Sequence, residues 1–170
     1  MKCLLDALRS EVGDSDFGYR IQALFAHALL RLGAVIQEIN QQGHPDIRAG
    51  LGDRSLLVQV KSVSHNNAPC SPAIQEPDLA GIRPSSGRET GYFAVLDCAA
   101  PPAWIMVGYE GMPKDCSKPL NMEALRARAN KNFSRECTDA FTEMILANKE
   151  KLHLLNYQTL CRRALRGEAL

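Results

Sequence analysis

The residues of this chain best suited to chemistry fall on two short segments on either side of a predicted turn. The second segment contains Gln59 and Lys61 within the run Leu-Val-Gln-Val-Lys-Ser at residues 57–62. Side chains alternate along a β-strand, so Gln59 and Lys61 point to the same face of a sheet. Leu56, Val58 and Val60 point to the opposite face, into a core that we expect helices to cover.

The first segment carries Asp46, which follows Pro45 at the start of a predicted strand. Residues 50–54 have the composition of a tight turn, which predicts a hairpin between the two strands. If the turn is centred near Gly52, paired residue numbers add up to roughly 105, which sets Asp46 opposite Gln59. Opposed residues share a face, so we expect Asp46, Gln59 and Lys61 to converge.

A carboxylate, an amide oxygen and an ammonium group in one place suit a hard divalent cation. Mg²⁺ prefers oxygen ligands and often takes only one or two carboxylates, with waters and substrate phosphate oxygens for the rest. In this interpretation Asp46, the Gln59 side-chain oxygen and the Val60 backbone carbonyl hold the metal. Lys61 then activates a metal-bound water or stabilises charge on the phosphate. This chemistry is metal-assisted hydrolysis of a phosphodiester.

The surrounding sequence predicts a mixed α/β (α+β) domain that positions these residues. Apolar residues at helical spacing predict helices over residues 2–12, 17–32, 122–132, 138–149 and 157–166, with a short one near 78–82. Runs rich in β-branched and aromatic residues predict strands over residues 34–39, 45–49, 56–63, 92–97 and 104–107. The order of helix, three strands, proline-rich crossover, strand, strand and helices predicts a mixed sheet in a single domain over residues 1–170.

Pro45-Asp46, a short hairpin and Gln59-Val60-Lys61, after an amphipathic helix, resemble the PD-(D/E)XK (restriction-endonuclease-like) nuclease superfamily. The glutamine in the third motif looks most like the Mrr-type restriction endonucleases. The similar core covers residues 16–107, with residues 121–170 as a helical C-terminal extension. The resemblance implies a Mg²⁺- or Mn²⁺-dependent endonuclease with catalytic Asp46, Gln59 and Lys61. Gln22 best matches the position on the first helix where relatives often carry an acidic residue.

The sequence departs from this pattern at two positions, since Gln22 and Gln59 stand where relatives often have carboxylates. Glu76 and Asp78, in the crossover, are candidates for a missing metal carboxylate. Two alternatives therefore stay open. The first is a catalytically silent relative that binds nucleic acid or a protein partner, and the second is an interaction protein that works through its C-terminal helices.

A nuclease must hold a polyanion, and DNA is the expected partner ahead of RNA. The expected nucleic-acid contacts are His44, Arg48, Arg54, Ser62, Arg126, Arg128 and Lys131. His27 falls off the apolar stripe of its helix and is predicted to lie on the surface. A homodimer through the C-terminal helices is predicted from apolar positions there, and the alternative is that they cover the sheet of a monomer. These positions are Leu125, Phe141, Ile145, Leu152, Leu155 and Leu160.

Composition limits the remaining possibilities. The chain has 170 residues, a formal charge of +1 and 45% hydrophobic residues, which fits a globular domain and excludes a polycationic tail protein. No apolar stretch approaches the roughly 20 residues of a membrane span, so we expect a cytoplasmic protein with no membrane partner. The six cysteines are scattered, with no CxxC pair, which favours free thiols. Phosphate-loop, dinucleotide and serine-hydrolase motifs do not occur.

Overall fold

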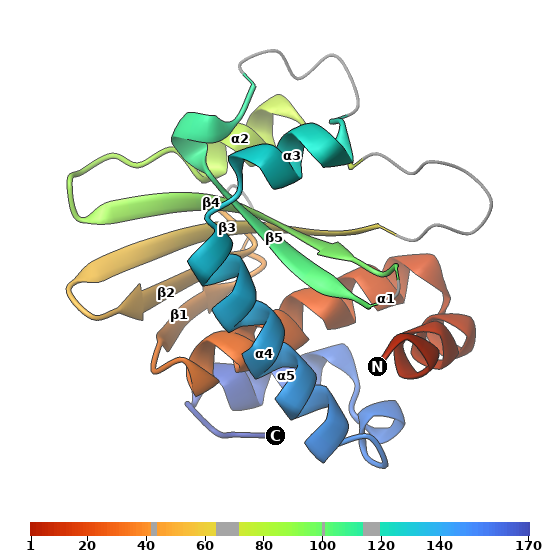
Figure 1. Ribbon diagram of the computed structural model, residues 1–170. Helices are drawn as coiled ribbons and strands as arrows, with labels where there is room; N and C mark the ends of the chain where they lie inside the picture. Colours follow the sequence, from red (N-terminus) through yellow and green to blue (C-terminus); the bar gives the residue numbers. More distant parts are fainter. Residues whose placement is uncertain (42–43, 64–71, 100, 114–119) are drawn as a thin grey trace.

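The computed structural model describes residues 1–41, 44–63, 72–99, 101–113 and 120–170 (Figure 1). Its five-stranded sheet has the order β1 (Val35–Ile39), β2 (Ile47–Leu51), β3 (Arg54–Val63), β4 (Glu89–Asp97) and β5 (Ala103–Gly108). Neighbouring strands are antiparallel except for β3 and β4, which are parallel. The predicted mixed α/β fold is confirmed.

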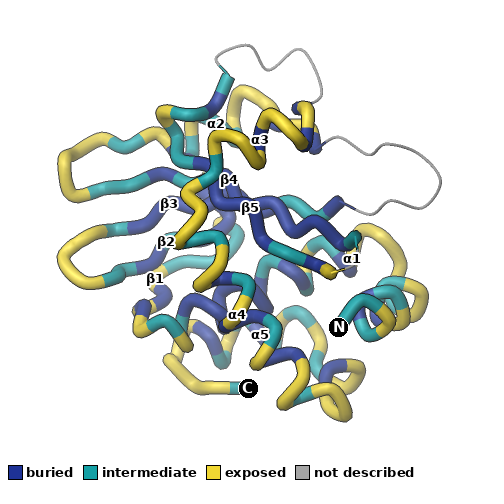
Figure 2. The backbone as a smooth tube through the Cα atoms, viewed as in Figure 1, coloured by how far each residue is buried: buried dark blue, intermediate teal, exposed yellow. Residues whose placement is uncertain are grey.

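Helices lie on both faces of this sheet (Figure 1). They are α1 (Lys2–Arg31), α2 (Glu76–Gly81), α3 (Met122–Arg128), α4 (Lys131–Ala147) and α5 (Tyr157–Leu165), with 3₁₀ turns η1 (Tyr109–Gly111) and η2 (Leu152–Leu154). One core joins α1, α4 and α5 to the face that contains Leu56, Val58 and Val60. A smaller core joins α2 and α3 to the face that contains Leu57 and Phe93. Figure 2 shows the central strands buried between these layers.

The β2–β3 hairpin has the predicted register. Ile47 pairs with Val58 and Arg48 with Leu57, and Gly52 in the turn has a φ of 61°. A left-handed conformation of this kind favours glycine. Continuing the pairing by one residue brings Asp46 opposite Gln59, as the sequence predicted. Because Arg48 and Leu57 face α2 and α3, Asp46, Gln59 and Lys61 lie on that face as well.

The two N-terminal helices expected over residues 2–12 and 17–32 form one element, α1, with a kink. Gly13, at φ 80° and ψ 166°, is the non-helical residue between the two halves. The second half lies against the sheet, where Phe25 stacks at 4.1 Å from the Trp104 ring, and Trp104 meets Phe141 of α4 edge-on at 5.4 Å. The predicted surface position of His27 is wrong: it is 2% exposed, and its Nε2 donates to Leu160 O at 3.0 Å. Helix α1 is covered by α5 on the side away from the sheet, which its apolar stripe alone did not indicate.

The C-terminal helices begin and end at other residues than predicted, because α3 ends at Arg128 and α4 begins at Lys131. The Asn130 side chain caps α4. Within α4, Ser134 Oγ accepts from Met106 N at 3.0 Å, and Thr138 Oγ1 accepts from Trp104 N at 2.9 Å. Side chains of α4 therefore satisfy two backbone amides of edge strand β5, which protects this edge against pairing with another strand.

The apolar C-terminal residues that suggested a dimer interface are mostly used inside the chain. Among the six named above, Leu155 is half-buried, and the other five are 8% exposed or less. They pack against the two faces of the sheet, as expected from the alternative in which the C-terminal helices cover the sheet of a monomer. No helix in the described ranges is long and apolar enough to cross a membrane.

Candidate functional site

Asp46, at the start of β2, is the centre of a buried polar cluster. Its Oδ2 accepts a hydrogen bond from Gln59 Nε2 at 2.8 Å and another from the backbone N–H of Val60 at 2.8 Å. Asp46 is 8% exposed and Gln59 is 4% exposed. The hairpin register explains this contact, because Asp46 and Gln59 are opposed on the face that α2 and α3 cover. Val60 contacts the Asp46 carboxylate through its backbone N–H, whereas the sequence interpretation assigned its carbonyl to the metal.

The electrostatic environment of Asp46 favours the neutral acid. Burial is the main cause and raises the pKa of Asp46, while the Val60 N–H and the Lys61 charge oppose that rise. The nearby charge of Asp78 raises the pKa further. A carboxylate kept ionised here at neutral pH therefore lacks part of the solvation that water would give it. A bound cation would supply what is missing.

Lys61 lies on the same face and connects β3 to the crossover helix. Its Nζ is 3.2 Å from Asp78 Oδ2. Asp78 is the third residue of α2, where its Oδ2 also accepts from Gln75 N at 3.1 Å as part of a capping box. The helix comes close to the sheet at Gly91 of β4, where a Cβ would lie 1.8 Å from the carbonyl oxygen of Ile82. Only glycine permits this approach, and the approach puts Asp78 beside Lys61.

Gln22 of α1 reaches the cluster through Asn40, a residue that sequence reasoning missed. Asn40 Nδ2 donates to Gln22 Oε1 at 2.8 Å and to Tyr157 Oη at 3.0 Å, and its backbone N donates to Asp46 O at 2.7 Å. Asn40 has a φ of 55°, a left-handed conformation that asparagine tolerates better than most residues. Its place between the strands predicted over residues 34–39 and 45–49 was the available signal. Tyr157 of α5 carried no local signal.

His44 and Arg48, two of the expected phosphate contacts, are engaged with carboxylates next to the cluster. His44 Nδ1 lies 3.0 Å from Glu38 Oε2, and Arg48 Nε lies 3.5 Å from the same oxygen. Arg48 Nη1 also donates to Glu89 Oε1 at 3.2 Å. These pairs are partly exposed, so a phosphate can compete for the cations at little cost.

The other expected nucleic-acid contacts lie apart from Asp46. Arg54 begins β3 at the hairpin tip, about five residues or 17 Å along the strand from Gln59. Ser62 lies on the opposite face from Lys61, in a small hollow with Arg9, Asp14 and Phe17.

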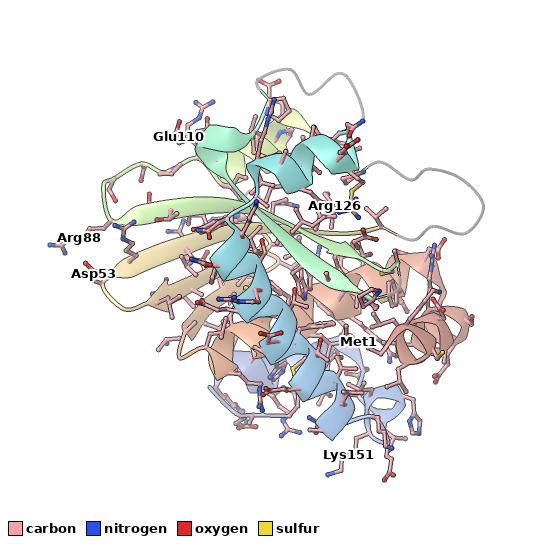
Figure 3. The ribbon with its side chains drawn as sticks, viewed as in Figure 1. Met1, Asp53, Arg88, Glu110, Arg126 and Lys151 are labelled. Carbon is pink, nitrogen blue, oxygen red and sulfur yellow. The ribbon has the colours of Figure 1, made fainter. Side chains whose placement is uncertain are left out.

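The three expected contacts of the C-terminal helices also make other interactions or lie elsewhere. Arg126 on α3 pairs with the buried carboxylate of Asp97 (Figure 3). Arg128 donates to Gly111 O at 3.2 Å, and Lys131 is exposed at the start of α4. The predicted contacts therefore do not form one surface: His44 and Arg48 lie beside Asp46, and Arg126, Arg128 and Lys131 lie on or next to α3. Arg54 and Ser62 lie apart from both groups.

The donors around Asp46 suit a weakly held cation. Within the described ranges no group of three or more His, Cys, Asp or Glu residues is placed to hold a metal ion. Two carboxylates, Asp46 and Asp78, are nevertheless close enough to interact electrostatically with Lys61 and with each other. Glu76 is exposed on the first turn of α2. Mg²⁺ is commonly held by one or two carboxylates, with waters and substrate oxygens completing the shell. Asp46, Asp78 and the Gln59 amide fit that pattern.

Comparisons with known proteins leave this geometry as the basis for any functional conclusion. The chain matches no protein-family model, no curated protein and no solved structure.

Proposed function

We propose that this chain is a metal-dependent nuclease that hydrolyses phosphodiester bonds, with DNA as its substrate ahead of RNA. The observation that carries the proposal is the convergence of Asp46, Gln59 and Lys61 on one face of the β2–β3 hairpin. The order of helix, antiparallel hairpin, crossover helix and parallel β4 supports the resemblance to PD-(D/E)XK nucleases. The same resemblance supports an endonuclease closest to the Mrr type.

The residues have separate roles in this proposal. Asp46, with Asp78 and the Gln59 amide, would hold Mg²⁺ or Mn²⁺, which supplies Lewis-acid activation of the phosphate and of the attacking water. Lys61 stabilises the charge that develops on the phosphate oxygens and leaves its exposed pair with Asp78 to do so. Gln22 accepts a hydrogen bond from the side-chain amide of Asn40 and so helps to position that residue. The backbone N–H of Asn40 in turn donates to the Asp46 carbonyl.

The polyanion is expected to run past the partly exposed cations beside Asp46. Arg48 contributes positive charge at the cluster, and His44 contributes a ring nitrogen that can hydrogen-bond a phosphate. A cytoplasmic location belongs to the same proposal. So does a homodimer that cleaves both strands, and sedimentation at micromolar concentration measures whether the chain is a dimer. Since five of the six apolar residues first considered for that interface are buried in the chain, a dimer must use other residues.

Cleavage assays with single-stranded, linear, supercoiled and branched DNA and with RNA test the proposal, each with Mg²⁺ or Mn²⁺. Lys61→Met is expected to lose at least about 100-fold in rate, since it removes a group that stabilises transition-state charge. Lys151→Met is the matched control, because Lys151 is exposed and lies in the segment between α4 and η2, outside the site (Figure 3). Equal rates for wild type and Lys61→Met, or no cleavage of any substrate by the wild type, would overturn the proposal.

A catalytically silent nucleic-acid-binding module is the second candidate. The observation that favours it is that both glutamine side chains are already engaged in hydrogen bonds within the chain: Gln22 accepts from Asn40, and Gln59 donates to Asp46. Calorimetric titration separates the candidates. A silent module binds DNA while Mg²⁺ and Mn²⁺ bind no more tightly to the wild type than to Asp46→Asn.

A further inference from the structure

A cavity of about 360 Å³ lies between α1 and the start of α5, and the proposed chemistry leaves it unused. Its lining residues are Asp16, Tyr19, Arg20, Asn156, Tyr157 and Gln158. This volume falls in the range of small-ligand sites. Two tyrosines, an arginine, two amide residues and the carboxylate residue Asp16 line it. The aromatic rings, the guanidinium group and the amides are groups that recognise a base and a phosphate.

Tyr157 connects this cavity to the candidate catalytic cluster. Its ring lines the cavity, and its hydroxyl accepts from Asn40 Nδ2 at 3.0 Å. The backbone N of the same Asn40 donates to Asp46 O at 2.7 Å. Burial, followed by the hydrogen bond to Cys161, raises the pKa of Tyr157 to about 12, so the phenol is neutral at physiological pH. The cavity and the Asp46 cluster are therefore neighbours with one shared side chain.

The aromatic part of the cavity is a tyrosine pair with an accessible ring. The Tyr19 and Tyr157 centroids are 5.5 Å apart at an interplanar angle of 47°. Tyr19 is 47% exposed, among the most exposed large apolar side chains described. A ring that is held by a neighbouring ring and open to solvent is a platform for stacking a base.

Groups that attract an anion lie beside the platform. Arg20 Nη1 is buried and has no hydrogen-bond partner within the described part of the chain. Helix α5 begins at Tyr157, and its cap Asn156 satisfies Thr159 N with the side chain and Leu160 N with the carbonyl. The N–H groups of Tyr157 and Gln158, in the first turn, have no acceptor within the helix. A phosphate between Arg20 and this helix start would satisfy both.

We propose that this cavity binds one unpaired nucleotide of the strand that the Asp46 cluster cleaves, with its base on Tyr19 and its phosphate at Arg20. The proposal rests on the nuclease function and adds a substrate preference to it. A base within a duplex has both faces covered by its neighbours and cannot stack on Tyr19. Single-stranded DNA, flaps and frayed ends are therefore bound in preference to a continuous duplex.

Binding without metal tests the cavity independently of cleavage. Single-stranded oligonucleotides with one 2-aminopurine are titrated with the full-length protein in EDTA, and affinity and fluorescence quenching are recorded. The wild type quenches the probe, and Tyr19→Ser weakens binding about tenfold, as expected for loss of one base–aromatic stack. Tyr19→Phe retains the ring and stays within about twofold of the wild type. Leu146→Ser on α4 has no effect, and Leu146 matches Tyr19 in exposure at 48%.

The outcomes separate this inference from the proposed function. The proposed nucleotide site is overturned if Tyr19→Ser binds and quenches the probe as the wild type does, or if the wild type does not bind the oligonucleotide. Cleavage of single-stranded DNA that Tyr19→Ser leaves unchanged also overturns it, while the nuclease stands. Tyr19-dependent quenching in a protein that cuts nothing with Mg²⁺ or Mn²⁺ supports the cavity and overturns the nuclease.

Discussion

Replacement of Gln59 by Glu tests whether the Asp46 cluster is built for a cation. Gln59 Nε2 donates to Asp46 Oδ2 at 2.8 Å, and both residues are almost fully buried. The substitution keeps the size of the side chain but replaces the donor with a second carboxylate. Two carboxylates then face each other where burial already raises the pKa of Asp46.

The size of the effect follows from this geometry. If the two carboxylates relax to a separation of about 5 Å, their repulsion at an effective dielectric constant of about 20 is about 3 kcal/mol. For a domain of this size, a loss of that order lowers Tm by roughly 6–12 °C. Saturation with Mg²⁺ at about 100 times Kd returns about 2.7 kcal/mol, because the ion binds only the folded state.

Thermal unfolding at pH 7.5, with EDTA or with Mg²⁺, measures both effects. Gln59→Glu is expected to melt below the wild type in EDTA and to gain more than the wild type from Mg²⁺. At a pH near 4 the deficit in EDTA shrinks, because one of the two carboxyls is then protonated. Gln59→Leu removes the donor without adding charge, and Gln37→Glu adds the same charge at an exposed position on β1.

Two results would refute this reasoning. One is a Gln59→Glu protein that is as stable as the wild type in EDTA. The other is a Mg²⁺-induced rise in Tm that is no larger for Gln59→Glu than for Gln37→Glu, since the second carboxylate would then not contribute to a cation site.

Two further predictions concern pH. Because burial raises the pKa of Asp46 in the folded state, ionisation of this carboxyl destabilises the fold. Asp46→Asn is therefore expected to be more stable than the wild type near pH 7. The difference is expected to disappear below pH 3.8, the ordinary pKa, because the carboxyl is then protonated in both the folded and the unfolded state. Urea unfolding of both proteins against pH checks this, and a less stable Asp46→Asn at pH 7 would contradict it. Burial lowers the pKa of His27, so its stabilising effect is complete above 6.5 and is lost as the pH falls through the lowered pKa. His27→Gln is expected to flatten the loss of stability below pH 6.5. An unchanged slope there would show that His27 is not the group whose protonation destabilises the fold.

The hairpin was predictable because its determinants are local. The alternation of Val58, Gln59, Val60 and Lys61 fixes which side chains share a face, and a short turn at Gly52 fixes the register. The sequence therefore placed Asp46 against Gln59, and their hydrogen bond agrees with that pairing. Strand existence and order followed from the same kind of local pattern.

The rest of the site depends on packing that no local pattern encodes. Tyr157 meets Asn40 across 117 positions of sequence, through the docking of α5 against α1. His27 falls off the apolar stripe predicted for α1, yet it is buried because α5 covers that side of the helix. Asp78, a candidate metal carboxylate from its position in the crossover, reaches Lys61 because Gly91 lets α2 approach β4, and the pair with Lys61 was not predicted.

The cost of the Asp46 cluster argues for a function in place of a purely structural role. Positions 46 and 59 lie on a sheet face whose neighbours, such as Leu57 and Phe93, form an apolar core. An apolar pair at these two positions would add to that core, whereas a buried carboxylate loses solvation that its hydrogen bonds do not fully replace. Side chains from α1, α5 and α2 complete the cluster, so its geometry requires the whole fold. Residues that reduce stability and are held from several elements are characteristic of sites selected for chemistry.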